Sequence, residues 1–444
     1  MKNMTEGSPA KLIILFTIPL ICGNILHQLY NIGDGKIVSE YIDEFAFAAV
    51  GMTAVVSNTL NSLIGGFTQG FGILISNSFG AKDEKRLRRS VAGSVLLTLL
   101  LVIVLTTLGM LFIKPILIAL NTPDEILPQA LSYVRIIIGG IFFTAAYNLM
   151  ANVLRAVGDS KTPLYFLILS VILNLGLDYI FVRILNMGIN GAAYATVISQ
   201  IICSASCLIY TLKRFRNIIP LREDWRASAN KLAELFTTGL SMGLMGCIVN
   251  IGTIILQGAI NNLGPDIIAA HVAGRRVLDL LMILIYTFGF SMTTYVSQNV
   301  GAKRIDRVRQ GVKSATIIVT VISLSLVLIC LIISRPVVTW ISSTENMNII
   351  DNGVMYCRTG VYFFVVLGPL FVLRCTLQGL GHKIIPLYSS VMELTIKVLS
   401  AYILVPAIGY FGVALTEPIS WMVMTTMLFF MYIHYIKKDI PMGE

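Results

Sequence analysis

Residues 91–113 read VAGSVLLTLLLVIVLTTLGMLFI, a stretch without a single charged side chain. About 20 apolar residues in a helix are enough to cross the roughly 30 Å hydrocarbon core of a bilayer. The segment just before it, residues 77–89, reads NSFGAKDEKRLRR and is rich in Lys and Arg. An uncharged apolar run beside a basic loop is typical of a transmembrane helix whose basic end faces the cytoplasm.

Similar apolar stretches recur along all 444 residues, and the composition agrees with them. The chain is 56% hydrophobic and only 13% charged, whereas soluble domains carry about 25% charged residues. This indicates an all-α membrane protein with twelve transmembrane helices. The predicted spans are 12–34, 45–76, 91–113, 130–153, 163–185, 191–212, 236–260, 267–297, 314–334, 354–378, 385–406 and 410–436.

Basic residues are concentrated in alternate loops. The termini and the loops after even-numbered spans carry most of them, with dense groups at 82–89, 213–231 and 303–313. The opposite loops hold only Lys36, Lys114, Arg183 and Arg335. This bias predicts that both termini are cytoplasmic and that the protein lies in the cell membrane. The net charge of +10 then reflects topology, and we expect no nucleic-acid partner.

The chain is an internal duplication. The block NSFGAK at 77–82 is echoed by QNVGAK at 298–303, with Gly80 and Gly301 at an offset of 221. A second block at 188–199 matches 409–420 at the same offset, and a third, 158–165, matches 381–388 at an offset of 223. Each copy holds six spans, so both enter the membrane in the same direction, as in a parallel repeat. We expect an N-terminal six-helix lobe at 1–212, a cytoplasmic linker at 213–231 and a C-terminal lobe at 232–444.

These blocks resemble the multidrug and toxic compound extrusion (MATE) family. The resemblance rests on Leu29-Tyr30-Asn31 with Asp34, on residues 48–51, 76–83 and 155–163, and on 377–381, and it covers nearly the whole chain. It implies a V-shaped pair of six-helix lobes. It also implies export of drug-like, often cationic, small molecules in exchange for inward H⁺ or Na⁺ by alternating access.

Asp34 and Asp178, both inside spans, have no basic neighbour one turn away. Charges within a span are costly and therefore point to function. Asp178 shares a helix face with Asn174, and Thr196 offers a hydroxyl on the next span. By the resemblance, Asp34, Asn174, Asp178 and Thr196 match a cation-coupling site in the N-terminal lobe. The same oxygen atoms would be the metal ligands if the coupling ion is Na⁺.

The C-terminal spans carry charges of both signs. Glu393 with Lys397, and Arg275 with Asp279, are spaced i, i+4 and can pair; Arg374 could pair with Glu417 on another helix. The sequence leaves open whether these charges only fix helix packing or contact the substrate or a proton. The candidate substrate-cavity residues are Tyr30, Gln257, Arg275, Asp279, Met282, Arg374, Glu393 and Lys397.

Three functions are compatible with these features. The leading hypothesis is a secondary active exporter that acts as a monomer on a small molecule. The alternatives are a flippase for lipid-linked precursors and a membrane-embedded enzyme. We expect no enzyme, because no HExxH motif occurs and the four histidines are scattered, and no ATP drive, because GxxxxGK[ST] is absent. The seven cysteines form no CxxC pair, so we predict no disulfide, no structural metal and no cofactor. The sequence does not distinguish Na⁺ from H⁺ or identify the substrate.

Overall fold

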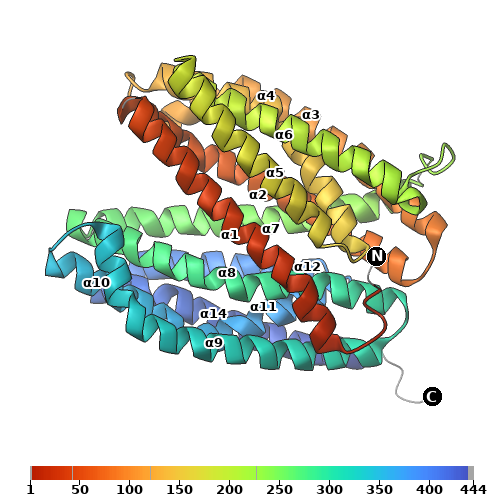
Figure 1. Ribbon diagram of the computed structural model, residues 1–444. Coiled ribbons are helices and arrows are strands. Elements are labelled where there is room, and N and C mark those ends of the chain that lie inside the picture. Colours follow the sequence, from red (N-terminus) through yellow and green to blue (C-terminus); the bar gives the residue numbers. More distant parts are fainter. Residues whose placement is uncertain (1–2, 43, 121, 227, 439–444) are drawn as a thin grey trace. The chain divides into compact units, whose positions relative to one another are not determined.

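The computed structural model describes residues 3–42, 44–120, 122–226 and 228–438, and it leaves out the side chains of 31–40, 44, 45, 47, 437 and 438. The described chain is built of helices and connecting turns (Figure 1). In the first half these are α1 (Pro9–Tyr41), α2 (Glu44–Gly80), α3 (Glu84–Ala119), α4 (Leu127–Ala156), α5 (Lys161–Asp178), η1 (Tyr179–Ile184), α6 (Gly188–Arg214) and η2 (Arg216–Ile218). In the second half they are α7 (Ala229–Asn261), α8 (Pro265–Gly301), α9 (Ile305–Ser342), α10 (Met347–Tyr362), α11 (Phe364–Gly379), α12 (Ile384–Leu399), η3 (Ser400–Leu404), α13 (Val405–Ile408) and α14 (Tyr410–Lys438).

Each predicted span falls within one helix, or within one run of consecutive helices, to within a residue. Among the described residues, ten helices are long and apolar enough to cross a membrane, and the pair α10 and α11 is an eleventh candidate. The predicted span 45–76 lies in the 37-residue α2, which is not among these candidates. The predicted span 354–378 is not straight, because α10 and α11 meet at Phe363 with a bend of 52°.

Contacts between Cα atoms divide the chain into two units. The first holds residues 1–3 and Ile18–Gly243, and the second holds Met4–Thr17 and Leu244–Glu444. In the first unit α4 packs against α2, α3 and α6, and in the second α8 packs against α9, α10 and α11. The contact boundaries lie inside α1 and α7, whereas the boundaries expected from sequence, 212 and 231, lie at the linker. The predicted domain limits therefore stay a prediction.

The duplication is visible in the backbone as well as in the sequence. Lys82 and Lys303, at matched positions, both adopt a positive φ, 55° and 56°, which is unusual for residues with a side chain. The π-helical segments η1 and η3 begin at Tyr179 and Ser400, which are related by the same offset as Gly80 and Gly301. The two halves therefore share local backbone geometry that composition alone would not impose.

Two glycines of α2 allow a close approach of α7 within the first unit. A Cβ atom on Gly66 would lie 2.5 Å from the carbonyl oxygen of Met242, and one on Gly70 would lie 2.7 Å from the Cα of Gly239. Small residues at helix contacts are the usual means of close packing in membranes. Gly65, by contrast, has open space around it.

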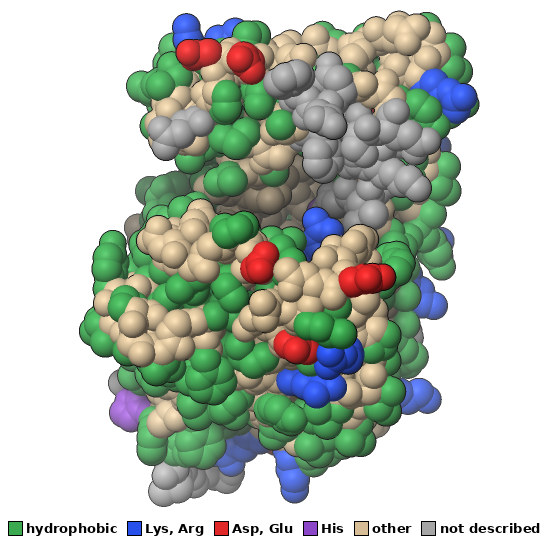
Figure 2. Space-filling view, turned by 90° about the vertical axis from the view of Figure 1, so that its left-hand side faces the viewer, with side chains coloured by type: hydrophobic (Ala, Val, Ile, Leu, Met, Phe, Trp, Pro, Cys, Tyr) green, Lys and Arg blue, Asp and Glu red, His purple; other side chains and the backbone are tan. Residues whose placement is uncertain are grey.

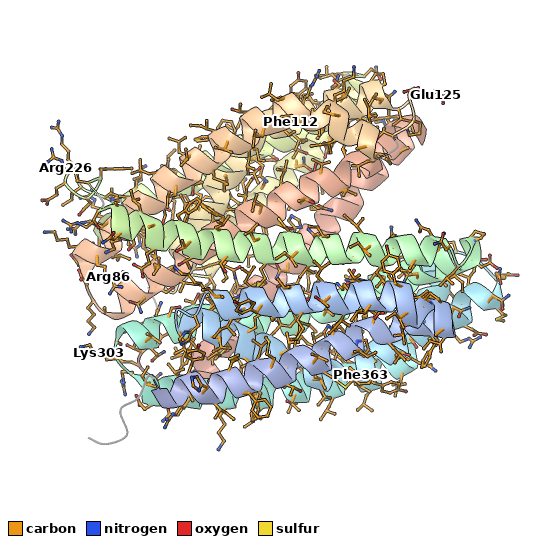
Figure 3. The ribbon with its side chains drawn as sticks, turned by 180° about the vertical axis from the view of Figure 1, so that it is seen from behind. Arg86, Phe112, Glu125, Arg226, Lys303 and Phe363 are labelled. Carbon is orange, nitrogen blue, oxygen red and sulfur yellow. The ribbon has the colours of Figure 1, made fainter. Side chains whose placement is uncertain are left out.

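Large apolar side chains cover the outer helices. Leu111 and Phe112 on α3 are 66% and 53% exposed, and Leu328 and Ile332 on α9 are 65% and 77% exposed. Figure 3 labels Phe112 on α3, and hydrophobic side chains are also spread over the helix ends seen in Figure 2. Exposure of so many apolar side chains is unfavourable in water and favourable in lipid.

Several charged residues of the first unit lie at the ends of its helices. In the first unit Arg86 and Arg226 lie at one end and Glu125 lies at the opposite end (Figure 3). Arg88, at the basic end, is paired with Asp224 of the linker over 2.8 Å. The first unit therefore has the unequal distribution of basic residues that the sequence predicted for its loops.

Candidate functional site

The first group of predicted site residues lies where α5, α6 and α1 meet in the first unit. The Asp178 side chain is 0% exposed and that of Asn174 1% exposed. Hydrogen-bond partners assign the orientation of the Asn174 amide: its nitrogen donates to Asp178 Oδ2 over 2.9 Å. The amide oxygen accepts from the backbone N–H and the hydroxyl of Thr196, at 3.2 and 3.3 Å. The shared helix face predicted for Asn174 and Asp178 is confirmed.

Tyr30 of α1 also belongs to this group. Its hydroxyl lies 3.4 Å from Oγ1 of Thr196. The sequence placed Tyr30 among the substrate-cavity candidates, whereas the structure places it beside the predicted cation site. Four side chains from three helices thus bring carboxylate, amide and hydroxyl groups together, and hard oxygen atoms are the groups that bind Na⁺ or exchange a proton.

The fourth residue of the predicted cation site, Asp34, lies on α1 one turn beyond Tyr30, but its side chain is outside the described residues. The predicted proximity of Asp34 to Asp178 therefore stays a prediction.

The second group lies within the second unit and forms a chain of charges of alternating sign. Arg275 Nε lies 2.8 Å from Asp279 Oδ1, and an Arg275 terminal nitrogen lies 3.2 Å from Glu417 Oε1. Lys397 Nζ lies 3.2 Å from the same Glu417 oxygen and 2.9 Å from Glu393 Oε1. The two pairs predicted from i, i+4 spacing are confirmed.

The predicted pairing of Arg374 with Glu417 is wrong. Arg374 instead approaches Glu393 Oε2, at 3.8 Å, and donates to the sulfur of Met424 over 3.2 Å. Glu417 is held by Arg275 and Lys397. Several helices supply acids and bases here, and the sequence does not show which pairs lie within reach.

Exposure decreases along this charge chain. Asp279 and Arg275 are 43% and 31% exposed, whereas Glu417, Glu393 and Lys397 are between 9% and 1% exposed. Charges removed from water must be paired to be tolerated. The network therefore has an accessible end on α8 and a buried end between α12 and α14.

Two other substrate-cavity candidates, Gln257 and Met282, are not part of the network's hydrogen bonds. Gln257 donates to Asn261 on its own helix, α7, over 2.9 Å. Met282 packs against the hydrophobic core of the second unit, one turn beyond Asp279 on α8.

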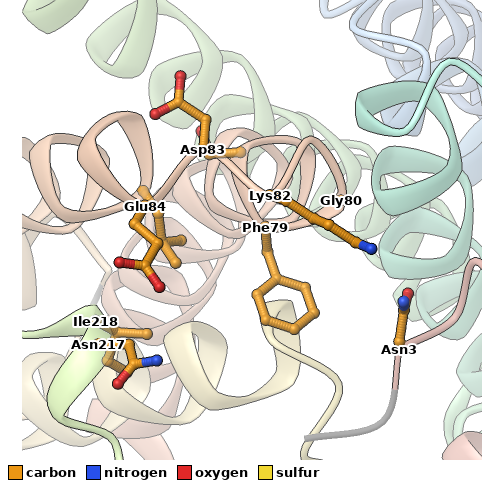
Figure 4. Close-up of a pocket in the computed structure, with 10 residues that line it drawn as sticks. Asn3, Phe79, Gly80, Lys82, Asp83, Glu84, Asn217 and Ile218 are labelled. Atoms are coloured by element: carbon orange, nitrogen blue, oxygen red, sulfur yellow. The ribbon is translucent and has the colours of Figure 1, made fainter.

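A cavity of about 290 Å³ opens at the turn between α2 and α3 in the first unit. Figure 4 shows the Glu84 side chain, at the start of α3, pointing toward Asn217 and Ile218 of η2, whereas Lys82 of the turn extends toward Asn3. Its lining contains none of the predicted site residues. The cavity lies beyond the predicted apolar spans, and we assign it no function.

Helices that pass through the bilayer, a duplicated architecture and buried ionisable groups inside the spans together define a multi-pass membrane transporter. The sequence profile of the MatE family matches residues 19–180 and 242–403, one segment in each half. The chain belongs to this family, whose members are transporters and not enzymes.

Curated relatives are similar over most of the chain. The "Probable multidrug resistance protein YpnP" of Bacillus subtilis is 28% identical over 69% of this chain and 68% of its own length. The "Probable multidrug resistance protein YoeA" of the same organism is 26% identical over 86% and 83%. A solved structure described as the outward-facing conformation of a multidrug resistance MATE family transporter of the MOP superfamily superposes with a TM-score of 0.92, at 24% identity over 99% of both chains. That structural match confirms the expected fold of twelve helices in two lobes.

Sequence reasoning missed two members of the sites. Thr253 accepts a hydrogen bond from Lys397 Nζ over 3.3 Å, and Glu417, noted only as a possible pairing partner, lies at the centre of the network. The position of Glu417 could have been found from the duplication, because Glu417 is the repeat counterpart of Thr196 at the offset that relates 188–199 to 409–420.

Proposed function

We propose that this transporter is a secondary active exporter in which binding of an inward-moving H⁺ or Na⁺ in the first unit drives the export of a drug-like small molecule. The coupling site consists of Asp178, Asn174 and Thr196, with Asp34 as the second carboxylate expected from the sequence. Alternating access of the two lobes carries the substrate across the membrane.

The observation that carries this proposal is the environment of Asp178. A fully buried carboxylate is costly as an anion, and here the Asn174 amide donates to it. Protonation or cation binding removes the cost of the buried negative charge. Loss of that proton or cation changes the charge inside the first unit, and this change can favour one conformation over another.

The hydroxyl groups suit the same role. Thr196 and Tyr30 are within hydrogen-bonding distance of each other, so α6 and α1 are joined beside Asp178. A cation that takes up these oxygen atoms would alter the contact between the two helices. This gives cation binding a direct route to the position of α1.

For the substrate we propose a cationic or amphipathic compound, because relatives named multidrug resistance or multidrug export proteins cover most of the chain. Its contacts in the second unit would be made at the accessible end of the charge network, by Asp279 and Arg275, with Met282 supplying an adaptable apolar surface. Gln257, Arg374, Glu393 and Lys397 would line or support that region.

The remaining properties follow from the sequence. We propose that the protein acts as a monomer in the cell membrane, with both termini cytoplasmic, because basic residues are concentrated on that side.

Transport by purified protein in proteoliposomes tests the proposal. A fluorescent cationic dye, with Na⁺ and pH gradients imposed separately, should accumulate in response to one of them in the wild type. Asp178→Asn should abolish that response. Asp224→Asn, in the linker, is the control and should retain it. Equal accumulation by Asp178→Asn and the wild type would contradict the proposal.

A further inference from the structure

Lys397 is the most deeply buried cation of the second-unit network, with a side chain only 1% exposed. Its ammonium nitrogen is surrounded by three oxygen atoms: Glu393 Oε1 at 2.9 Å, Glu417 Oε1 at 3.2 Å and Thr253 Oγ1 at 3.3 Å. Two carboxylates and a hydroxyl are also the kind of oxygen shell that surrounds a bound monovalent cation. The ammonium group, which is fixed to the end of the Lys397 side chain, thus occupies a site lined by oxygen atoms.

This site is the repeat counterpart of the proposed coupling site. Glu417 corresponds to Thr196, since both lie in the matched blocks 409–420 and 188–199 and occupy the same place in them. Lys397 corresponds to Asn174 at the offset of 223 that relates the blocks 381–388 and 158–165. Both pairs are in contact: Asn174 with Thr196 at 3.3 Å and Lys397 with Glu417 at 3.2 Å.

The third helix of each site also corresponds. Helices α1 and α7 have the same length, 33 residues, and they take the same place at the start of the two copies. When their ends are aligned, Tyr30 of α1 matches Asn250 of α7, and Thr253 lies one turn beyond it. In the first unit a hydroxyl from α1 meets a residue of α5 and one of α6. In the second unit a hydroxyl from α7 meets a residue of α12 and one of α14. The three-helix arrangement is therefore the same in both.

We propose that Lys397 is a tethered cation, which permanently fills the second unit's counterpart of the coupling site. The second unit therefore takes up no free cation, and the cycle uses the first-unit site alone. This inference rests on the proposed function for the role of the first-unit site, but the nature of the second site can be tested separately.

The charges of the network make the proposal specific. Arg275, Arg374 and Lys397 balance Asp279, Glu393 and Glu417. Removal of the Lys397 ammonium leaves one uncompensated negative charge in a buried position, which is unfavourable unless a cation replaces it. The vacated position should then bind one small monovalent cation, such as ammonium or Na⁺.

The test is the thermal stability of the full-length purified protein in detergent. Lys397→Ala should have a lower melting temperature than the wild type. Ammonium chloride should raise the melting temperature of Lys397→Ala saturably, by about 5 °C or more, relative to choline chloride at the same ionic strength. Sodium chloride, compared in the same way, reports whether Na⁺ also fits.

The controls separate a cation site from an ordinary ion pair. Ammonium chloride should not raise the melting temperature of the wild type in this way, because Lys397 already fills the second-unit site. Nor should it raise that of Lys397→Ala/Glu417→Gln, in which the charges balance again. If Lys397 only fixes helix packing, Lys397→Ala is destabilised but ammonium and choline act alike, and the proposal is overturned.

A second variant covers the case in which Lys397→Ala does not fold. Lys397→Met keeps the apolar stem that packs against α7 near Gly252 and removes only the charge. Recovery of Lys397→Met in ammonium but not in choline supports the proposal, and equal recovery or equal loss in both salts contradicts it. These measurements need no transport, so their outcome is independent of the Asp178→Asn experiment.

Discussion

The hydroxyl groups of Thr196 and Tyr30 lie 3.4 Å apart and join α6 to α1. Thr196 also donates to Asn174, which in turn donates to Asp178. The contact therefore lies at one end of a continuous polar chain that reaches the buried carboxylate. Changes at Thr196 should alter cation binding without any change at Asp178 itself.

Replacement of Thr196 by Val should weaken coupling, because the side chain keeps its shape but loses the hydroxyl. Loss of one hydrogen-bonding partner for a buried group costs about 1–3 kcal/mol, so the cation concentration for half-maximal transport should rise roughly tenfold. Thr196→Ser keeps the hydroxyl and should remain near the wild type. Dye transport at varied cation concentration measures both, and equal behaviour of the two variants would exclude a role for the hydroxyl.

Glu393→Gln should destabilise the second unit strongly. Glu393 holds both Lys397 and Arg374 in a buried region, and removal of one partner of a buried ion pair costs about 3–5 kcal/mol. The matched control is Asp351→Asn, since Arg335 and Asp351 form a pair at 3.0 Å whose side chains are 54% and 59% exposed. That variant should lose at most about 1 kcal/mol. Thermal unfolding in detergent compares them, and similar losses would show that the buried network contributes no more than a surface pair.

Gly66→Ala and Gly70→Ala should disrupt the contact between α2 and α7. An added Cβ would meet backbone atoms at 2.5–2.9 Å, and overpacking of this kind costs about 1–3 kcal/mol. Gly65→Ala places a methyl group in open space and should be neutral or slightly stabilising. Melting temperatures of the three purified variants test this, and an effect of Gly65→Ala as large as the other two would argue against the close helix contact.

Asp224 should make stability depend on acid pH. Burial acts to raise its pKa, but a hydrogen bond from the Leu221 N–H and the hydrogen bond and charge of Arg88 outweigh it, and the pKa falls below the ordinary value of 3.8. A carboxylate with a lowered folded-state pKa stabilises the fold at pH values above its unfolded-state pKa, and this contribution is lost as the pH falls through the lower, folded-state value.

The corresponding measurement compares the melting temperature of the wild type with that of Asp224→Asn across pH. The wild type should be more stable by a constant amount from about pH 5 to pH 8, and the difference should shrink below about pH 4. A difference that stays constant down to about pH 2 would show that ionisation of Asp224 contributes nothing.

The apolar runs predicted the spans because lipid imposes both their length and their lack of charge. Helix ends were less predictable: α3 begins at Glu84, before the apolar run, because its basic first turns continue beyond the bilayer. The bend at Phe363 has no signal in the sequence that we can identify. Pro369, the nearest proline in α11, lies well beyond the bend.

The candidate sites were predictable where residues lie on one helix. The spacing of Asn174 and Asp178, and that of Glu393 and Lys397, fixes each pair on one face. Contacts between helices were not predictable, which is why the sequence does not show that Tyr30 lies beside Thr196 and pairs Arg374 with the wrong acid. The duplication is the one sequence signal that relates the two sites, through Thr196 and Glu417.

The most direct test of the account is the ratio of the substrate concentrations inside and outside proteoliposomes that contain Asp178→Asn. The ratio is measured at steady state under increasing cation gradients. We expect the wild type to raise the ratio with the gradient, and Asp178→Asn to equilibrate the substrate to equal concentrations whatever gradient is imposed. Accumulation by Asp178→Asn that follows the gradient as the wild type does would place cation coupling elsewhere in the molecule.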